Sequence, residues 1–289
     1  MEFVMVSVFT AGDPWRTGNP LAVFPDAAGL GAPQMQAIAQ TLNLSETTFV
    51  TGGDDGSYDV RIFTPSEELP FAGHPTIGTS WTLRHLGRLS GDSFVQRSPA
   101  GETPVTLAGD LLQFDRRGGT ASPDMETRDV RAHLKIARAL RLEERDVSLE
   151  AYELGRSGVL RPALSDAGLE HFIVPLRDLD ALGRVQVDAA ALAELSPFGA
   201  YCFTGVGAGR VRARGLFPGT GIDEDPATGS AAACLGVYLV DRVGPIELQI
   251  EQGVEIDRRS QMRVSAGKEA VRVGGRCELL LAGKLERLP

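Results

Sequence analysis

The sequence predicts an α+β fold with two pseudo-symmetric lobes, each a mixed β-sheet or barrel wrapped around a central α-helix. Short strand-like segments greatly outnumber helices, which favours a sheet-rich fold. One phrase also occurs twice, first as His74-Pro75-Thr76-Ile77-Gly78-Thr79 and again as Asp225-Pro226-Ala227-Thr228-Gly229-Ser230. A repeat of roughly 150 residues is too long for a solenoid, so it indicates a duplicated domain.

In both copies of this phrase a polar residue precedes a proline. A polar residue is typical of the helix N-cap, and proline fits the first helical position because its missing N–H costs nothing there. We therefore expect His74 and Asp225 to be N-cap residues of two equivalent helices. A helix N-terminus carries a partial positive charge, so two of them facing one cleft would form a receptacle for a small anion.

The repeat extends upstream of these helices. A displacement of 153 residues superimposes Thr51-Gly52 on Thr204-Gly205, and the same displacement aligns Arg61 with Arg214. Each region predicts a strand, a glycine-rich turn and a second strand, preceded by a helix with apolar spacing. These predicted segments are a helix over 33–42 with strands over 48–51 and 58–63, and a helix over 188–195 with strands over 200–204 and 211–217.

The domain boundaries follow from the duplication. We expect an N-terminal lobe over 1–118, a C-terminal lobe over 130–289, and a polar linker rich in Gly and Pro at about 116–129. Further strands are expected over 93–97 and 104–114 in one half and over 246–250 and 262–281 in the other, with the last strand free to pack back on the N-terminal lobe. The run 231–240 is apolar on every side, which predicts a helix enclosed by sheet.

Composition excludes several classes of function. A 289-residue chain that is 43% hydrophobic and 23% charged is typical of a soluble globular protein. The net charge of −9 argues against nucleic acid or an anionic membrane as a partner. Three widely spaced cysteines indicate reduced thiols, hence a cytoplasmic protein, and they do not have the spacing of a metal site. The N-terminal run predicts a first strand and not a signal peptide.

The glycine-rich run 205–209 could suggest a nucleotide-binding loop. Such a loop must lead from a strand into a helix, whereas Arg210 to Arg214 alternates with apolar residues as a strand does. We therefore interpret the run as a hairpin turn.

Four residues are candidates for chemistry. His74 is a poor N-cap, so it is either a buried histidine bonded to a carbonyl or an active-site group. Asp225 is either an ordinary helix cap or a site residue. Glu46 aligns with Gly199, so the duplication does not explain it, and it is either an exposed strand end or the asymmetric functional group of one lobe. Asn19, in the turn Gly18-Asn19-Pro20, is either part of a bare turn or a ligand contact.

Four blocks of the chain together resemble the PhzF-like isomerases, a family named for phenazine biosynthesis. They occur in order and read NLSETTFV at 43–50, RIFTP at 61–65, LPFAGHP at 69–75 and EDPATGSA at 224–231. Near the C-terminus QGVEI at 252–256 is similar to another block of the family, so the resemblance spans essentially the whole chain. The resemblance implies the diaminopimelate epimerase fold, in which two similar lobes hold the active site between them. It also implies a homodimer that uses neither metal nor organic cofactor.

The resemblance further implies residue roles. Glu46 would be the acid/base that moves a proton on the substrate, and His74 and Asp225 would flank it. Gly73, Gly229 and Ser230 would bind the carboxylate of a small substrate. The residue types suit this chemistry, because one carboxyl group can remove and return a proton if a closed site raises its pKa toward the working pH.

Two alternatives remain open. An epimerase or racemase would use Glu46 with His74 or Asp225 as the second base. A two-thiol racemase is disfavoured, since neither predicted helix start carries a cysteine, and Cys202 and Cys234 are better explained as core residues. The second alternative is a non-catalytic protein that binds a small anion or serves as a partner-binding scaffold.

Overall fold

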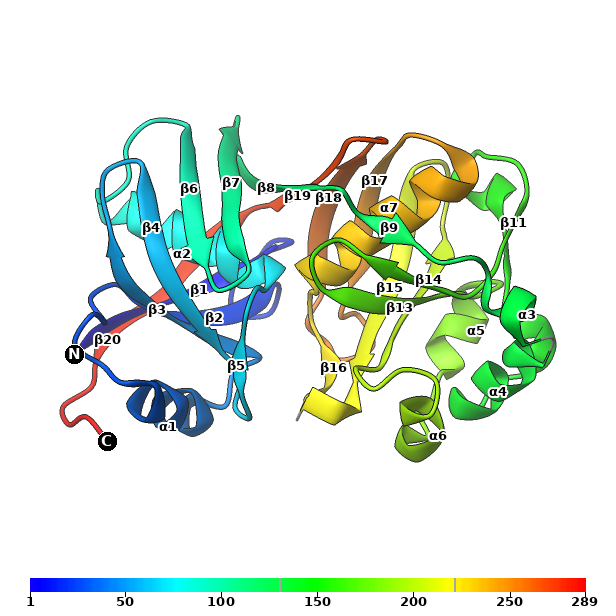
Figure 1. Ribbon diagram of the computed structural model, residues 1–289, viewed down its shortest axis with the longest axis horizontal. Coiled ribbons are helices and arrows are strands. Elements are labelled where there is room, and N and C mark those ends of the chain that lie inside the picture. Colours follow the sequence, from blue (N-terminus) through cyan, green and yellow to red (C-terminus); the bar gives the residue numbers. More distant parts are fainter. Residues whose placement is uncertain (130, 221) are drawn as a thin grey trace. The chain divides into compact units, whose positions relative to one another are not determined.

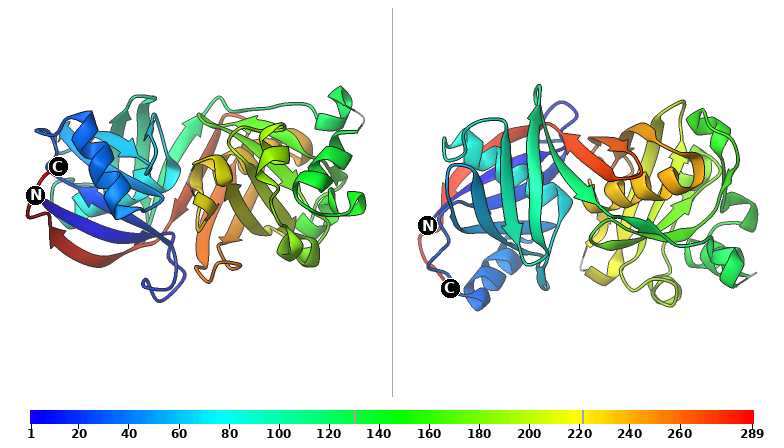
Figure 2. Two further views of the ribbon diagram at one scale, coloured as in Figure 1. Left: turned by 90° about the horizontal axis from the view of Figure 1, so that it is seen from below. Right: turned by 45° about the horizontal axis from the view of Figure 1, so that its top comes forward.

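The computed structural model describes residues 1–129, 131–220 and 222–289, and the chain forms two compact units (Figures 1 and 2). Unit 1 consists of 1–115, 259–261 and 273–289, and unit 2 consists of 116–258 and 262–272. The segment 116–129, expected as a linker, belongs to unit 2 and contains β9 (Thr120–Ala121) and α3 (Met125–Arg128). The C-terminal residues 273–289 belong to unit 1.

Unit 1 is a mixed sheet with two helices. Its main strands are β1 (Glu2–Val8), β2 (Asn19–Phe24), β3 (Glu46–Gly53), β4 (Ser57–Phe63), β6 (Ser93–Ser98), β7 (Gly101–Ala108), β8 (Leu111–Arg117) and β20 (Cys277–Lys284). The pairs β2–β3 and β4–β6 are parallel. All the others, β1–β2, β1–β20, β3–β4, β6–β7 and β7–β8, are antiparallel. Helices α1 (Ala32–Leu42) and α2 (Gly73–His85) connect the two parallel pairs.

Helix α2 is buried within this sheet, against β1, β2, β3, β7 and β20 (Figures 1 and 2). Gly78 allows the close approach, because a Cβ added there would lie 2.5 Å from Leu21 Cδ2 and 2.7 Å from Val8 Cγ2. Three buried hydroxyl groups of the helix, those of Thr76, Thr79 and Ser80, are bonded to side chains of the sheet. Tyr58 Oη lies 2.7 Å from Ser80 Oγ and donates to Gln96 Oε1 at 3.0 Å. These bonds fix the helix along its axis, since a buried polar group without a partner is costly.

Unit 2 repeats the same topology. Strands β12 (Ala163–Asp166) and β13 (Glu170–Pro175) are antiparallel, and β13 runs parallel to β14 (Ala200–Gly205). Strand β14 is antiparallel to β15 (Arg210–Phe217), which runs parallel to β17 (Ile246–Gln252). The buried helix α7 (Gly229–Val243) takes the place of α2. The predicted fold class, two related lobes that each enclose a helix, is therefore confirmed.

The remaining elements of the described chain are shorter or peripheral. They are β5 (Glu68–Leu69), α4 (Ala132–Ala139), η1 (Glu144–Asp146), β10 (Leu149–Glu150), η2 (Ala151–Leu154), β11 (Val159–Leu160), α5 (Leu179–Arg184), α6 (Ala189–Ala193), η3 (Pro218–Thr220), β16 (Ile222–Asp225), β18 (Ser260–Ala266) and β19 (Ala270–Gly275). The predicted helix over 188–195 is the short α6, and Asp188 caps it by accepting from the Ala191 amide at 3.1 Å. No helix of the described residues is long and apolar enough to cross a membrane.

The duplication also preserves one ion pair. Arg61 of β4 binds Glu68 of β5 through two bonds of 2.7 and 2.6 Å. At the equivalent place in unit 2, Arg214 of β15 binds Glu224 of β16 at 3.0 and 2.7 Å. Two parallel bonds fix the direction of both partners. Each pair therefore holds the strand that leads to the start of the buried helix.

The tight packing at Gly78 predicts a stability defect. The variant Gly78→Val places extra methyl groups against Leu21 and Val8, and such overpacking typically costs about 1–3 kcal/mol. We expect a lower urea midpoint by circular dichroism. The control is Gly183→Ala in α5, where an added Cβ meets nothing within 4 Å and only improves helix propensity. Equal midpoints for the two variants would contradict this account of α2.

Candidate functional site

The start of helix α2 differs from the prediction. The helix begins at Gly73 with Ala72 as the N-cap, so His74 is its second residue and Pro75 its third. Proline is tolerated here because the first N–H groups of any helix lack an intrahelical partner. The prediction that His74 is the N-cap is therefore wrong.

The start of helix α7 also differs. Asp225 ends strand β16, where it pairs with Gly215, and the helix begins at Gly229 with Thr228 as the N-cap. The prediction that Asp225 is the N-cap is therefore wrong, because the backbone of Asp225 is paired with β15 as part of a strand. Its carboxylate still serves this end of the helix, since Oδ2 accepts from Thr228 Oγ1 at 2.6 Å.

In unit 1 three predicted site residues meet at the start of α2. Asn19 and Glu46 are the first residues of the parallel neighbours β2 and β3. His74 Nδ1 lies 3.3 Å from Glu46 Oε2 and 3.4 Å from Asn19 Nδ2. His74 is 2% exposed and Glu46 15%. The parallel pairing explains the juxtaposition, because it sets both strand starts at one edge of the sheet.

The turn before Asn19 is fixed by its glycine. Gly18 has φ +77°, and an added Cβ would collide with Ser7 Oγ and lie 2.7 Å from the carbonyl oxygen of Val8. Its amide donates to the carbonyl of Arg259 at 3.0 Å. Only glycine combines this backbone angle with such close approach. The turn therefore fixes the position of Asn19 beside His74.

His74 is a neutral imidazole. Burial lowers its pKa to about 3, because an apolar surrounding disfavours the charged form. The contact with Glu46 is therefore not a pair of opposite charges. It is a close polar contact of 3.3 Å between Nδ1 of a neutral ring and a carboxyl oxygen. Nε2 has no hydrogen-bond partner among residues 1–129, 131–220 and 222–289.

In unit 2 a polar network surrounds Asp225 and Thr228. Gln252 Nε2 donates to the Asp225 carbonyl at 2.8 Å and to Thr228 Oγ1 at 3.0 Å. Gln252 Oε1 accepts from the Thr228 amide at 3.3 Å and from Tyr201 Oη at 3.0 Å. Gly215 leaves room for the network, since an added Cβ would lie 2.6 Å from Thr228 Oγ1. The carboxylate of Asp225 is thus held at a fixed place before α7.

Sequence reasoning missed one member of this region. His171 of β13 is 6% exposed, and its Nε2 lies 2.9 Å from Oγ of Ser230, the second residue of α7. Burial lowers its pKa to about 4, so it too is neutral. A single histidine in an apolar strand has no pattern that would have indicated this contact.

The two helix starts share a chemical property. Neither Ala72 nor Thr228 makes a side-chain capping bond to its helix. The first amides, those of Gly73 and His74 in α2 and of Gly229 and Ser230 in α7, therefore remain donors that can bind an anion. Thus each unit has its own candidate binding end beside titratable or hydroxyl side chains.

The cysteines do not take part. Cys202 and Cys234 are buried, and burial raises the pKa of Cys202 to about 12 and that of Cys234 further. A thiol with so high a pKa is a poor base or nucleophile. This supports the prediction that the two residues are core groups.

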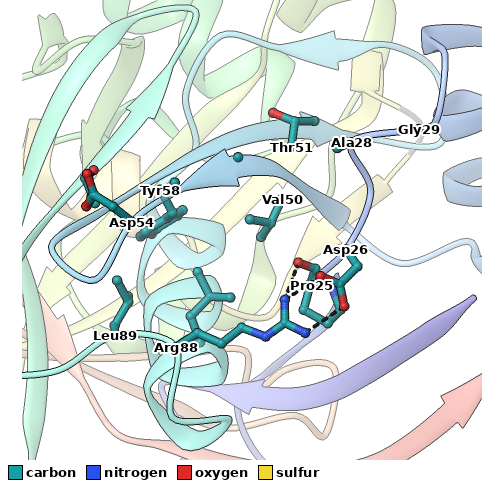
Figure 3. Close-up of a pocket in the computed structure, with 14 residues that line it drawn as sticks. Pro25, Asp26, Ala28, Gly29, Val50, Thr51, Asp54, Tyr58, Arg88 and Leu89 are labelled. Atoms are coloured by element: carbon teal, nitrogen blue, oxygen red, sulfur yellow. Dashed lines mark hydrogen bonds and ion pairs between the residues drawn. The ribbon is translucent and has the colours of Figure 1, made fainter.

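A cavity in unit 1 shares no residue with this site. Figure 3 shows it between the β3–β4 hairpin and the C-terminal end of α2, with the guanidinium of Arg88 bound to Asp26 by two bonds of 2.6 Å. Its other charged lining residue is Asp54. Because Arg88 is already neutralised by Asp26, this cavity offers no free cation for a carboxylate.

Solved structures of known proteins share this architecture. A phenazine biosynthesis protein of the PhzF family from Bacillus anthracis matches with a TM-score of 0.83 at 23% identity, over 99% of this chain and 98% of that one. A hydroxyproline epimerase from Agrobacterium vitis matches with a TM-score of 0.59 at 12% identity, over 98% and 91% of the two chains. The fold is thus that of the PhzF and epimerase class.

The sequence comparison is more specific. The family model described as "Phenazine biosynthesis-like protein" matches residues 6–283. A trans-2,3-dihydro-3-hydroxyanthranilate isomerase from Pseudomonas fluorescens is 37% identical over 92% of this chain and 90% of its own length. The chain belongs to the phenazine biosynthesis-like (PhzF) family, and the protein is an isomerase.

The two buried imidazoles predict an acid-sensitive fold. Each has a folded-state pKa below its unfolded value of about 6.5. Unfolding therefore takes up a proton at each as pH falls below 6.5, and stability is lost by about 1.4 kcal/mol per pH unit per histidine until pH approaches the folded-state pKa.

The urea midpoint is expected to be lower at pH 5 than at pH 7. In His171→Gln, which cannot titrate, the loss between the two pH values is expected to be smaller by about 2 kcal/mol at most. An identical pH dependence in this variant and the wild type would show that His171 is not a buried neutral group.

The network at Asp225 predicts a stability effect. The variant Thr228→Val keeps the side-chain shape but removes the hydroxyl bonded to Asp225, which costs about 1–3 kcal/mol because a buried carboxyl oxygen loses this hydrogen bond. Thr228→Ser retains the hydroxyl and serves as the control. Thermal unfolding of both variants measures the difference, and a Thr228→Val protein as stable as Thr228→Ser would refute the role of this bond.

Proposed function

We propose that the protein is a cofactor-independent isomerase that moves a proton on a small metabolite bearing a carboxylate. The observation that carries the proposal is the contact of Glu46 with the neutral, buried His74 at the uncapped end of α2, in a chain that belongs to an isomerase family. A carboxyl group beside a neutral imidazole can exist in two protonation states at little cost, as a proton carrier requires.

In this proposal Glu46 removes a proton from one carbon of the substrate and returns it to another. His74 keeps the carboxyl group oriented through Nδ1, and Asn19 Nδ2 contacts the same ring nitrogen at 3.4 Å and so limits rotation of the imidazole. The amides of Gly73 and His74 stabilise the negative charge that develops when the C–H bond breaks. Because His74 is neutral, it does not lock Glu46 in the ionised form as a permanent cation would.

Unit 2 has its own set of groups suited to a small carboxylate, and we propose them as binding residues. The amides of Gly229 and Ser230, together with the Ser230 hydroxyl, are suited to a carboxylate group, which accepts hydrogen bonds and favours a helix N-terminus. Asp225, held by Thr228, is suited to a donor on the substrate such as an amino or hydroxyl group. A ring carrying both a carboxylate and such a donor would use both sets of groups.

The proposal extends to the state of the protein in the cell. We propose a cytoplasmic homodimer, in line with the resemblance to the family and with the three unpaired thiols Cys202, Cys234 and Cys277. Size-exclusion chromatography with light scattering tests the dimer, and a mass of one chain would contradict it.

The proton carrier is tested by isotope exchange. We expect the wild-type protein to incorporate solvent deuterium into trans-2,3-dihydro-3-hydroxyanthranilate, the compound for which the related isomerases are named. If it does not, a screened panel of other cyclic amino-carboxylates is expected to contain a compound that exchanges. Glu46→Gln is expected to lose at least about a thousandfold of this rate with an unchanged fold, because the amide cannot take up the proton. Mass spectrometry measures exchange, and circular dichroism monitors the fold.

Glu102→Gln on the exposed face of β7 is the control, since Glu102 is an exposed residue that pairs with Arg97. Full exchange in Glu46→Gln would refute the role of Glu46. A wild-type protein that is stabilised by these carboxylates but exchanges no proton would instead indicate the non-catalytic binding protein. Chiral analysis of the product separates an epimerase from an isomerase that moves a double bond.

A further inference from the structure

We infer that His171 is a positioning residue that turns the hydroxyl proton of Ser230 toward a bound carboxylate. The inference rests on the proposed function, because it assigns a task to a residue of the same binding end. It adds a residue that none of the sequence motifs contains.

The contact itself is well defined. His171 Nε2 and Ser230 Oγ are 2.9 Å apart, and both residues are less than a tenth exposed. The ring of His171 also meets the ring of Phe217 edge to face at a centroid distance of 5.6 Å. Packing on one side and the hydrogen bond on the other leave the imidazole little freedom to rotate.

The direction of the hydrogen bond follows from the other ring nitrogen. Nδ1 of His171 is buried without a hydrogen-bond partner in the described part of the chain. A buried N–H without an acceptor is costly, so the single proton of the neutral ring resides on Nε2. His171 therefore donates to Ser230, and the Ser230 oxygen acts as the acceptor.

The consequence concerns the remaining proton of Ser230. Since its oxygen accepts from His171, the hydroxyl proton is free to be donated, and no other side chain of the described residues bonds to this hydroxyl. The Ser230 amide and the hydroxyl then both act as donors at the same helix end. Such a pair of donors suits a carboxylate and disfavours an ammonium group.

The same geometry argues against a nucleophilic serine. A serine is activated when a histidine accepts its proton and a third group orients the histidine through the other nitrogen. Here Nδ1 has no such partner among the residues described, and burial depresses the basicity of the ring. His171 therefore acts as a donor and does not serve as a base.

Unit 1 contains a related arrangement. Asn19 of β2 contacts His74, and His171 of β13 contacts Ser230, so in each unit a strand side chain holds the second residue of the buried helix. The histidine lies on the buried helix α2 in unit 1 and on strand β13 in unit 2. The duplicated scaffold thus orients the group at each helix end from the neighbouring strand.

The first test uses the protein without ligand. Nitrogen-15 NMR of the histidine rings distinguishes the two neutral tautomers, and Ser230→Ala identifies the signals of the contact. We expect the His171 proton on Nε2 in the wild type at pH 7. A proton on Nδ1 would overturn the inference, whatever the substrate of the protein is.

The second test uses 3-hydroxyanthranilate, an aromatic carboxylate that cannot undergo the isomerisation, as the calorimetric probe. Ser230→Ala and His171→Leu are each expected to weaken binding about tenfold, and the double variant is expected to be no weaker than either single variant, because both changes remove one and the same bond. In His171→Gln the side-chain amide can donate a hydrogen bond to Ser230 in place of Nε2, so this variant is expected to retain most of the affinity. It is the control that distinguishes loss of this hydrogen bond from a general folding defect.

The outcomes separate the inference from the proposed function. Additive losses in the double variant would overturn the positioning role while leaving carboxylate binding intact. Wild-type protein that binds no carboxylate would overturn the proposed function, and the tautomer measurement would still decide the hydrogen bond. With an active substrate, His171→Leu is expected to raise KM with little change in kcat, since a bond to a spectator carboxylate contributes uniform binding.

Discussion

The structure depends on the burial of one whole helix inside the sheet of each unit. A helix enclosed in this way cannot leave its polar groups to water, and several of the hydroxyl groups of α2 are bonded to sheet side chains, as Ser80 is to Tyr58. The first amides are the exception, because no side chain caps the helix at Ala72 or Thr228. Each unit therefore has backbone N–H donors at one helix end, where a ligand with hydrogen-bond acceptors can bind.

A second feature is the neutral charge state of the imidazoles. His74 and His171 are buried, and burial keeps both uncharged at physiological pH. A charged imidazole would compete with the helix end for an anion and would hold Glu46 in one protonation state. The neutral rings can orient a carboxyl group and a hydroxyl group without fixing a counter-charge. As a consequence of these two neutral buried rings, we expect the fold to lose stability as the pH falls.

Much of the fold could be predicted from the sequence, because the duplication is visible in repeated turns, prolines and arginines. Arg61 and Arg214 align in the sequence and make the same ion pair in the structure. The helix starts were misassigned because a polar residue before proline is typical of an N-cap, whereas strand pairing to Gly215 decides the conformation of Asp225. Tertiary pairing of this kind cannot be read from a local motif.

The site was predicted in part. The meeting of Glu46, His74 and Asn19 agrees with their selection as candidates, although their roles stay predictions. His171 was missed because its partner Ser230 lies far away in the sequence and one histidine in a strand gives no periodic signal. Residues 131–150, which include α4 and η1, likewise have no aligned counterpart in the first half, so these short elements were not predicted.

The most direct measurement is a crystal structure with 3-hydroxyanthranilate bound. The account predicts that its carboxylate oxygens accept hydrogen bonds from the first amides of a buried helix, with a ring carbon beside the carboxyl group of Glu46. A ligand found instead in the cavity beside Arg88, or with its carboxylate away from both helix ends, would contradict the account.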